Sequence, residues 1–262
     1  MSTLVCLHAH PDDESISTGG SIARAAREGH RVVLVVATDG RHGETPDDLA
    51  PGETLVDRRR RETEHSAEVL GVSDIRWLGY RDSGMTGWEQ NHDPEAFVGA
   101  DLEEAAGRFA DILVDVGADV VTCYDWHGGY GHPDHIMVHR VGHRAVELLA
   151  ERGRDVRLLE ATMNRTRIAR MRAMNSEDGD FDPDAPADDG NPFGSTEDEI
   201  TMAVDVSSFV EQKRRSMSCH ASQITDQSFF LQMPPEMFAM AFGTEWFIEA
   251  GRPGGAPAGW FL

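Results

Sequence analysis

Residues 4 to 14 read Leu-Val-Cys-Leu-His-Ala-His-Pro-Asp-Asp-Glu, a short apolar run that ends in two histidines and three carboxylates. A brief aliphatic run of this kind is typical of a buried strand in a parallel sheet. The polar residues that follow such a strand lie at its carboxyl end, the edge where open α/β sheets bind their ligands. The stretch therefore predicts an α/β fold with its chemistry placed directly after the first strand.

The polar end of this stretch offers the ligands of a metal ion. His10 can supply a neutral nitrogen and Asp13 a hard oxygen to one cation, while Asp12 stays uncoordinated and acts on a metal-bound water. Acids packed this closely repel one another unless a cation or a proton lies between them. The alternative is a solvated acidic loop that caps the following helix, and the metal site is the favoured interpretation.

A second motif, Gly-Gly-Tyr-Gly-His-Pro-Asp-His, occupies residues 128 to 135. Its proline suits the first position of a helix, which makes His132 the N-cap and places His135 one turn into the helix. Asp134 suits the positive end of the helix dipole, and the glycines around Tyr130 let the backbone approach a ligand. Either the two histidines share one metal centre, or one binds the metal while the other faces the substrate.

Alternating strands and helices surround the two motifs. Strands are predicted at 31–37, 75–78, 119–123, 156–163 and 200–206, and helices at 17–28, 55–70, 97–116, 136–149 and 207–221. This alternation predicts a Rossmann-like α/β fold, with a mostly parallel sheet, helices on both faces and a smaller mixed C-terminal portion. We expect a metal-binding catalytic domain at 1–175, an acidic mobile loop at 176–199, and a C-terminal portion at 200–262 that packs on the same domain.

Composition excludes several partners. The formal net charge is −22 and no stretch rich in Lys and Arg is long enough to grip a phosphate backbone, so nucleic acid is not expected. No apolar run approaches the length of a membrane span, and no membrane partner is expected. The three cysteines are scattered and no signal peptide is recognisable, which predicts a cytoplasmic protein. A homo-oligomer is compatible with the sequence.

Two further groups of charged residues attract attention. Four arginines at 58–61 cover all faces of a predicted helix, so most of them are expected to pair with acids on a solvated surface. His139 and His143 continue the spacing of His135 along its helix. Later turns carry them away from a site at the helix N-terminus, and we therefore favour leaving them out of the metal site.

The paired motifs resemble those of the LmbE-like (PIG-L) family of zinc-dependent N-acetylglucosaminyl deacetylases. The glycine-rich version is most similar to the actinobacterial branch of mycothiol metabolism. Shorter similarities lie at Arg59-x-x-Glu62, at 81–85 and, more weakly, at 213–223. The resemblance implies a Rossmann-like fold and an amidohydrolase that removes an N-acetyl group from a small amino-sugar, such as an N-acetylglucosaminyl inositol.

The resemblance also implies roles for individual residues. His10, Asp13 and His135 would bind Zn²⁺, although the same donors accept other divalent metals. Asp12 would act as general base, and His132 would help to hold the oxyanion. Supporting roles fall to Tyr130 at the oxyanion, Asp134 orienting His132, and Arg59 and Asp82 binding the substrate.

Two alternatives to acetyl removal remain. The first is cleavage of the larger amide in a mycothiol S-conjugate, for which the resembling amidases carry a lysine near Ser17. The small Ser17 favours acetyl removal and a contact with the substrate, unless it only opens the following helix as an N-cap. The second is a non-catalytic homologue that binds metal or sugar. Asp12 argues against it, because a pure binder has no use for a spare carboxylate.

Overall fold

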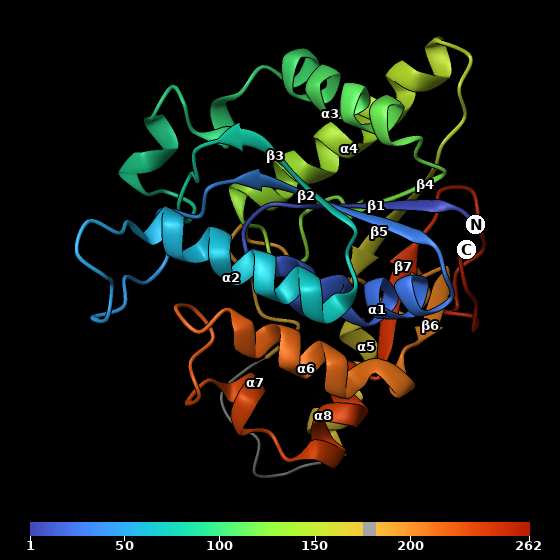
Figure 1. Cartoon of the computed structure of the whole chain (residues 1–262). Helices are drawn as coiled ribbons and strands as arrows, with labels where there is room; N and C mark the ends of the chain where they lie inside the picture. Colours follow the sequence, from blue (N-terminus) through green and yellow to red (C-terminus); the bar gives the residue numbers. More distant parts are fainter. Residues whose placement is uncertain (175–181) are drawn as a thin grey trace.

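The computed structural model describes residues 1–174 and 182–262. Residues 175–181, with which the predicted acidic loop at 176–199 begins, lie outside the described residues. Within the described ranges the centre of the protein is a seven-stranded sheet in the order β3-β2-β1-β4-β5-β7-β6 (Figure 1). Its strands are β1 (Thr3–His8), β2 (Arg31–Thr38), β3 (Asp74–Tyr80), β4 (Val120–Tyr124), β5 (Arg157–Thr162), β6 (Met202–Asp205) and β7 (Thr244–Ile248).

The first five strands are parallel, whereas β7 runs antiparallel to both β5 and β6. The predicted mostly parallel α/β sheet is therefore confirmed. The chain reverses its strand order at β1, from which β2 and β3 extend to one side and β4 and β5 to the other. Such a switch point opens a crevice at the carboxyl ends of the central strands. The loop that follows β1 and the loop that follows β4 therefore meet there.

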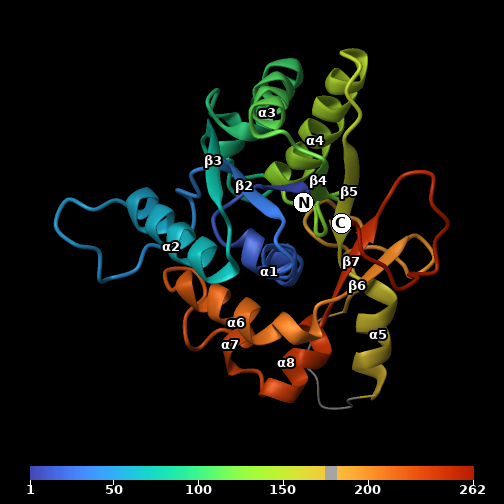
Figure 2. The same ribbon diagram turned by 45° about the vertical axis from the view of Figure 1, so that its right-hand side comes forward.

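Helices cover both faces of the sheet (Figure 2). On one face lie α3 (Leu102–Val116) and α4 (Pro133–Glu151), and on the other lie α1 (Gly19–Arg27), α2 (Leu55–Leu70) and α6 (Val210–Cys219). The alternation of apolar residues along β1 serves both layers: Val5 and Leu7 face the α3 and α4 core, and Leu4 and Cys6 face the α1 core. A third apolar cluster joins α6 to the short helices α7 (Phe229–Gln232) and α8 (Pro235–Phe242).

Local signals explain where the predicted helices begin and end. The helix predicted at 55–70 has these bounds, because Thr54 and Asp57 form a capping box and Gly71 ends the helix in the left-handed conformation. The helix predicted at 97–116 begins later, at Leu102, where Asp101 caps it. Helix α5 (Arg165–Met174) and strand β7 were not among the predicted elements.

One buried ion pair joins two elements of the C-terminal portion and contacts the start of α1. Lys213 of α6 and Glu245 of β7 are 1% and 3% exposed, and Nζ lies 2.5 Å from Oε1. The Glu245 carboxylate also accepts the backbone N–H groups of Gly20 and Ser21, at 2.8 Å each, at the N-terminus of α1. A buried charge needs such partners, and this one joins three distant segments. Among the described residues no helix combines the length and apolar character needed to cross a membrane.

Candidate active site

The loop after β1 holds Asp12 in a strained backbone conformation. Its φ of 107° is sterically unfavourable for a residue with a side chain, and such strain persists only where surrounding contacts fix it. The Asp12 N–H donates to Glu14 Oε2 at 3.1 Å, and its carbonyl accepts the Ser15 N–H at 3.0 Å. A π-helical turn at Glu14–Thr18 then leads into α1. The strained residue is thus anchored from both of its backbone polar groups.

Three predicted metal ligands converge beside this loop. Asp13 Oδ2 lies 3.4 Å from His10 Nδ1 and 3.4 Å from His135 Nε2. Atoms that bind a zinc ion tetrahedrally at about 2.0–2.1 Å are separated from one another by roughly 3.3–3.4 Å. The separations of Asp13 from both histidines are therefore those expected of donors to one cation.

The His135 ring is prepared for such a cation. Its Nδ1 donates to the Gly128 carbonyl at 3.1 Å, and the Tyr124 ring stacks on it at 4.5 Å between centroids. Its Nε2 is buried and has no hydrogen-bond partner among the described residues. A Cβ on Gly128 would lie 2.3 Å from the Cβ of His135, so only glycine allows this approach. Fixing one nitrogen and leaving the other unpaired is the usual arrangement of a metal-binding histidine.

His10 is fixed in the same manner by carboxylates. Its Nε2 lies 3.1 Å from Asp134 Oδ2 and 3.5 Å from Asp82 Oδ1, which leaves Nδ1 toward Asp13. Burial lowers the pKa of His10, but hydrogen bonds to the facing carboxylates outweigh it and raise that pKa well above its usual value. The Asp134 carboxylate in turn accepts the backbone N–H of Ser83 at 2.9 Å and the Ser83 hydroxyl.

This arrangement departs from one expectation: the Asp134 carboxylate contacts His10 and Ser83, and it is the backbone N–H of Asp134 that holds His132. That N–H donates to His132 Nδ1 at 3.1 Å. A neutral ring that accepts at Nδ1 carries its proton on Nε2. Burial, followed by the charges of His10 and His135, lowers the pKa of His132 to about 2, so the ring stays neutral.

The hydrogen bond separates the roles of the two motif histidines. One nitrogen each of His10, His132 and His135 lies within 4.8 Å of the others, so proximity alone does not distinguish them. His135 presents a bare nitrogen, whereas His132 presents an N–H. The geometry therefore favours His135 as a ligand and His132 as a hydrogen-bond donor.

Asp12 has the properties of a general base. Burial raises the pKa of its carboxyl to about 6, with the Arg59 charge opposing this and the Asp13 charge adding to it. A carboxylate with a pKa near neutrality can accept a proton and later return it. The side chain accepts from Arg59 Nη2 at 3.1 Å and is only partly buried, so it remains accessible to a reacting group.

Arg59, expected to bind substrate, is 4% exposed and its donors face the protein. It donates to the Gly40 carbonyl at 2.7 Å, to the Pro11 carbonyl at 2.5 Å and to Asp12. These contacts fix the strained loop and the carboxylate of the base. A contact between Arg59 and substrate stays a prediction.

The other predicted site residues lie around this centre. Asp82 is 4% exposed and accepts the backbone N–H groups of His42 and Gly84, at 3.1 and 2.8 Å. The Tyr130 ring lies edge-on to His135, with 4.9 Å between ring centroids. Ser17 lies inside the π-helical turn, so the N-cap interpretation is wrong; Thr18 precedes α1. Substrate contacts of Asp82 and Ser17 stay predictions.

A buried polar cluster beneath Asp12 was missed by the sequence reasoning. Glu14 Oε1 lies 2.6 Å from His220 Nε2 and 2.5 Å from the Ser66 hydroxyl, which also contacts the hydroxyl of Ser216 at 2.7 Å. These residues come from the β1 loop, α2, α6 and the segment after α6. The weak similarity at 213–223 was the only signal that pointed to His220.

The described part of the predicted acidic loop lies against the glycine-rich motif. The Asp188 N–H donates to the Tyr130 carbonyl at 2.9 Å, and the Gly194 N–H donates to the Gly129 carbonyl at 2.6 Å. This segment therefore forms a wall beside the site. Whether the loop moves, and whether the domain bounds are as expected, stay predictions.

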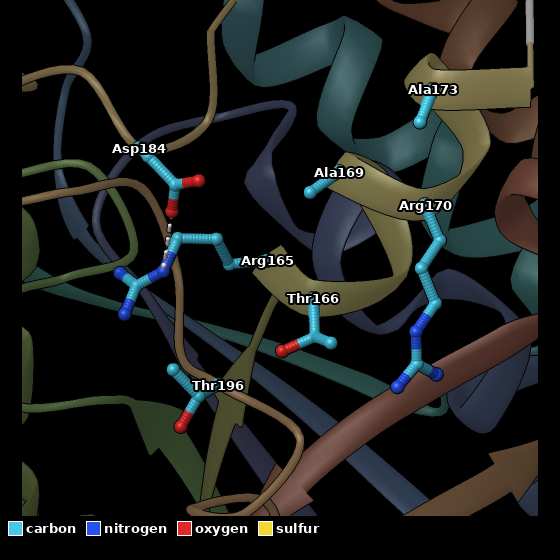
Figure 3. A pocket seen from close by; sticks show the side chains of 7 residues that line it. All are labelled: Arg165, Thr166, Ala169, Arg170, Ala173, Asp184 and Thr196. Carbon is cyan, nitrogen blue, oxygen red and sulfur yellow. Dashed lines mark ion pairs between the residues drawn. The ribbon is translucent and has the colours of Figure 1, made fainter.

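A cavity of about 390 Å³ lies near this wall (Figure 3), and no residue of the histidine and aspartate cluster lines it. Its lining is Arg165, Thr166, Ala169, Arg170, Ala173, Asp184 and Thr196. The two arginines pair with acids: Arg165 Nε lies 3.4 Å from Asp184, and Arg170 Nη1 lies 2.8 Å from Glu197. We therefore place the chemistry at the carboxyl ends of β1 and β4 and not in this cavity.

Comparison with known proteins gives concordant matches. Residues 5–146 match the PIG-L family, described as GlcNAc-PI de-N-acetylase. A 1D-myo-inositol 2-acetamido-2-deoxy-alpha-D-glucopyranoside deacetylase of Acidothermus cellulolyticus is 41% identical over 261 residues, covering 94% of this chain and 88% of the relative. A protein of the same description from Nocardiopsis dassonvillei is 44% identical over 239 residues, covering 84% and 83%.

A solved structure shares the fold along almost the whole chain. The N,N'-diacetylchitobiose deacetylase from Pyrococcus horikoshii, solved with an inhibitor, superposes with a TM-score of 0.57 at 25% identity. The match covers 95% of this chain and 82% of that protein. The likeness thus extends past the family match into the C-terminal portion.

Proposed function

The chain belongs to the PIG-L family of GlcNAc-PI de-N-acetylases, and from that premise we propose that it removes the N-acetyl group from a glucosaminide of the N-acetylglucosaminyl inositol type. The observation that carries this proposal is the bare, buried Nε2 of His135 facing Asp13 Oδ2 at 3.4 Å. Asp12, next to Asp13 in the chain, supplies a spare carboxylate, and His132 supplies a neutral imidazole N–H. Together they supply the groups that amide hydrolysis needs.

His10 Nδ1, Asp13 Oδ2 and His135 Nε2 would hold the metal, for which we propose Zn²⁺. Three nitrogen and oxygen donors with room for a further ligand are typical of a catalytic zinc site. When bound, the ion supplies Lewis acidity to water and to the amide carbonyl.

Asp12 takes the proton of the attacking water and later delivers it to the leaving amine. Its carboxyl suits both steps because its pKa of about 6 lies close to neutrality. His132 donates its Nε2 proton to the oxygen that becomes negative during the attack. Because burial keeps this imidazole neutral, it acts as a donor and does not compete with Asp12 for the proton.

Supporting residues complete the assignment. Asp134 orients His10 through its carboxylate and His132 through its backbone N–H. We propose that Tyr130 borders the oxyanion, that Asp82 and Ser17 bound the sugar pocket, and that Arg59 acts mainly on Asp12. Because Ser17 is small and neutral, no cation stands at this position to pair with the polar arm of a larger conjugate.

The test compares two substrates on the purified protein with its metal content measured. Specificity constants for an N-acetylglucosaminyl inositol and for a bulky N-acyl conjugate are compared. We expect the acetylated substrate to be preferred. A strong preference for the bulky conjugate would overturn acetyl specificity and leave an amidohydrolase. Metal binding without hydrolysis of either substrate would instead indicate a non-catalytic homologue.

A further inference from the structure

A second group of metal-ligating side chains lies between α4 and the sheet, beyond the catalytic histidines. It consists of Cys123 on β4 and of His139 and His143 on α4, with Glu160 of β5 beside the two histidines. The helix passes closely over the strand at Gly142, where an added Cβ would lie 2.9 Å from Cys123 Cβ and 3.1 Å from its Sγ. This close approach brings the thiol beneath the helix, between the two histidines that flank the glycine.

The donor atoms of this group are close enough to share one cation. Cys123 Sγ and one nitrogen from each histidine all lie within 4.8 Å of one another. Glu160 Oε1 lies 2.7 Å from His143 Nε2 and 3.9 Å from His139 Nδ1, so it faces both rings. The rings themselves are 4.3 Å apart at their centroids. Two histidines four apart on one helix, with a thiol opposite, give three donors, and the Glu160 carboxylate lies next to them.

Hydrogen bonds among these groups also account for their positions. His139 Nδ1 contacts the Tyr124 carbonyl at 3.0 Å, and the Cys123 thiol contacts the same carbonyl at 3.4 Å. A cation would displace the thiol proton and the proton between His143 and Glu160, whereas His139 can keep its Nδ1 contact with the carbonyl and bind through its other nitrogen. The thiolate and the neighbouring carboxylate would together balance the charge of a divalent ion.

We infer that Cys123, His139 and His143 form a second cation site, which takes one zinc-like divalent ion beside Glu160. A donor set of one sulfur and two nitrogens suits a borderline-soft ion such as Zn²⁺ or Co²⁺. Histidine and cysteine donors of this kind are the usual ligands of zinc in proteins. The side chains of His139 and His143 are 19% and 34% exposed, so an ion can enter from solvent.

This site is separate from the catalytic centre. His139 lies about one helical turn after His135, roughly 6 Å further along the axis of α4. The groups that gather around His10 contain histidines and aspartates and no cysteine. A bound ion would tie α4, whose first turn carries His132 and His135, to β4 and β5.

Cobalt provides a test because only a thiolate ligand gives a sulfur-to-cobalt charge-transfer absorption. The full chain is loaded with Co²⁺, and the bound metal is counted by elemental analysis. We expect two equivalents and a charge-transfer band. His143→Ala should lose the band and one equivalent while keeping deacetylase turnover. His135→Ala should keep the band and lose the other equivalent.

Two substitutions of cysteine complete the design. Cys123→Ser should abolish the band, and Cys219→Ser, at a half-exposed position outside the cluster, should retain it. His143→Ala decides the matter if the buried Cys123 variant does not fold, since His143 lies at the surface. A saturated wild-type protein without the band would overturn the inference. So would a band that survives in His143→Ala or disappears in Cys219→Ser.

Discussion

The two loops that carry the active site are held in position by different means. The loop after β1 is fixed by charged side chains from distant segments: Arg59 of α2 holds Asp12, and His220 holds Glu14. The glycine-rich loop before α4 is fixed mainly by backbone, through the Gly128 carbonyl at His135 and the Asp134 N–H at His132. The difference follows from their charges, because clustered carboxylates need cationic partners and imidazoles need only a carbonyl or an N–H.

The largest effect is expected from the ligand on the glycine-rich loop. His135→Ala removes one of three protein donors, so the purified variant should lose most of the zinc of the catalytic site and essentially all deacetylation. Metal analysis and turnover measured on the same preparation check this outcome. If the variant kept all of its catalytic metal, the β1 loop and the glycine-rich loop would not share the ion.

For Asp12 on the β1 loop, we expect turnover to be lost while the metal stays bound. Asp12→Ala should keep the metal and lower turnover by about a hundredfold or more, the usual scale for a general base. His135→Ala, analysed for metal in the same way, is the matched control. If Asp12→Ala loses the metal of the catalytic site, the division between base and ligand is wrong.

His132 is expected to act on catalysis with a smaller effect. His132→Ala removes the Nε2 donor without removing a ligand, so the catalytic constant should fall by roughly ten- to a thousandfold with little change in KM. Steady-state kinetics on the zinc-loaded variant measure both constants. A rise in KM alone would place His132 in substrate binding, and loss of zinc would exchange its role with that of His135.

A substitution of Arg59 tests whether this residue supports the β1 loop or contacts the substrate. Arg59→Lys keeps a charge but cannot reach the Gly40 and Pro11 carbonyls and Asp12 together. We expect kcat to fall by roughly ten- to a hundredfold, the scale of a residue that supports an active group, with KM nearly unchanged. Arg60→Lys, on the same helix, is the control. An increase confined to KM would restore the substrate-binding role.

His220 should have the smallest effect on turnover and a clear effect on stability. Burial lowers its pKa, but the facing Glu14 carboxylate more than offsets this and raises the pKa above its usual value of 6.5. The pair therefore stabilises the fold fully below pH 6.5, and its contribution is lost as the pH rises through the higher folded value.

His220→Ala should cost about 3–5 kcal/mol of unfolding free energy at mildly acidic pH, because it leaves Glu14 buried without its cation. The difference from wild type should shrink in alkaline solution. Urea unfolding at several pH values measures it, with Cys219→Ser as the neighbouring control. A difference that is constant with pH would show that the ion pair does not anchor the β1 loop.

The sequence predicted one kind of feature well and another poorly. His10, Asp12, Asp13 and His135 could be predicted because each lies within a few residues of a strand end or a helix start. The contact between Glu14 and His220 spans 206 residues, and no local pattern encodes it.

The same distinction holds for the fold. The capping signals of α2 stand beside the helix they bound. Strand β7 joins the sheet only by pairing with β5 and β6, and its sequence within an aromatic-rich stretch shows no alternation. The predicted N-cap position of His132 is confirmed, because its ring accepts the Asp134 N–H. The sequence did not indicate that the Asp134 carboxylate contacts His10 instead.

The pair between Lys213 and Glu245 has a practical consequence, because Lys213 is the only lysine of the chain and is 1% exposed. Amine-directed reagents would find this side chain shielded on the native protein. Modification of Lys213 requires that α6 move away from β7 and the start of α1. The degree of labelling of Lys213 therefore counts the molecules that have opened.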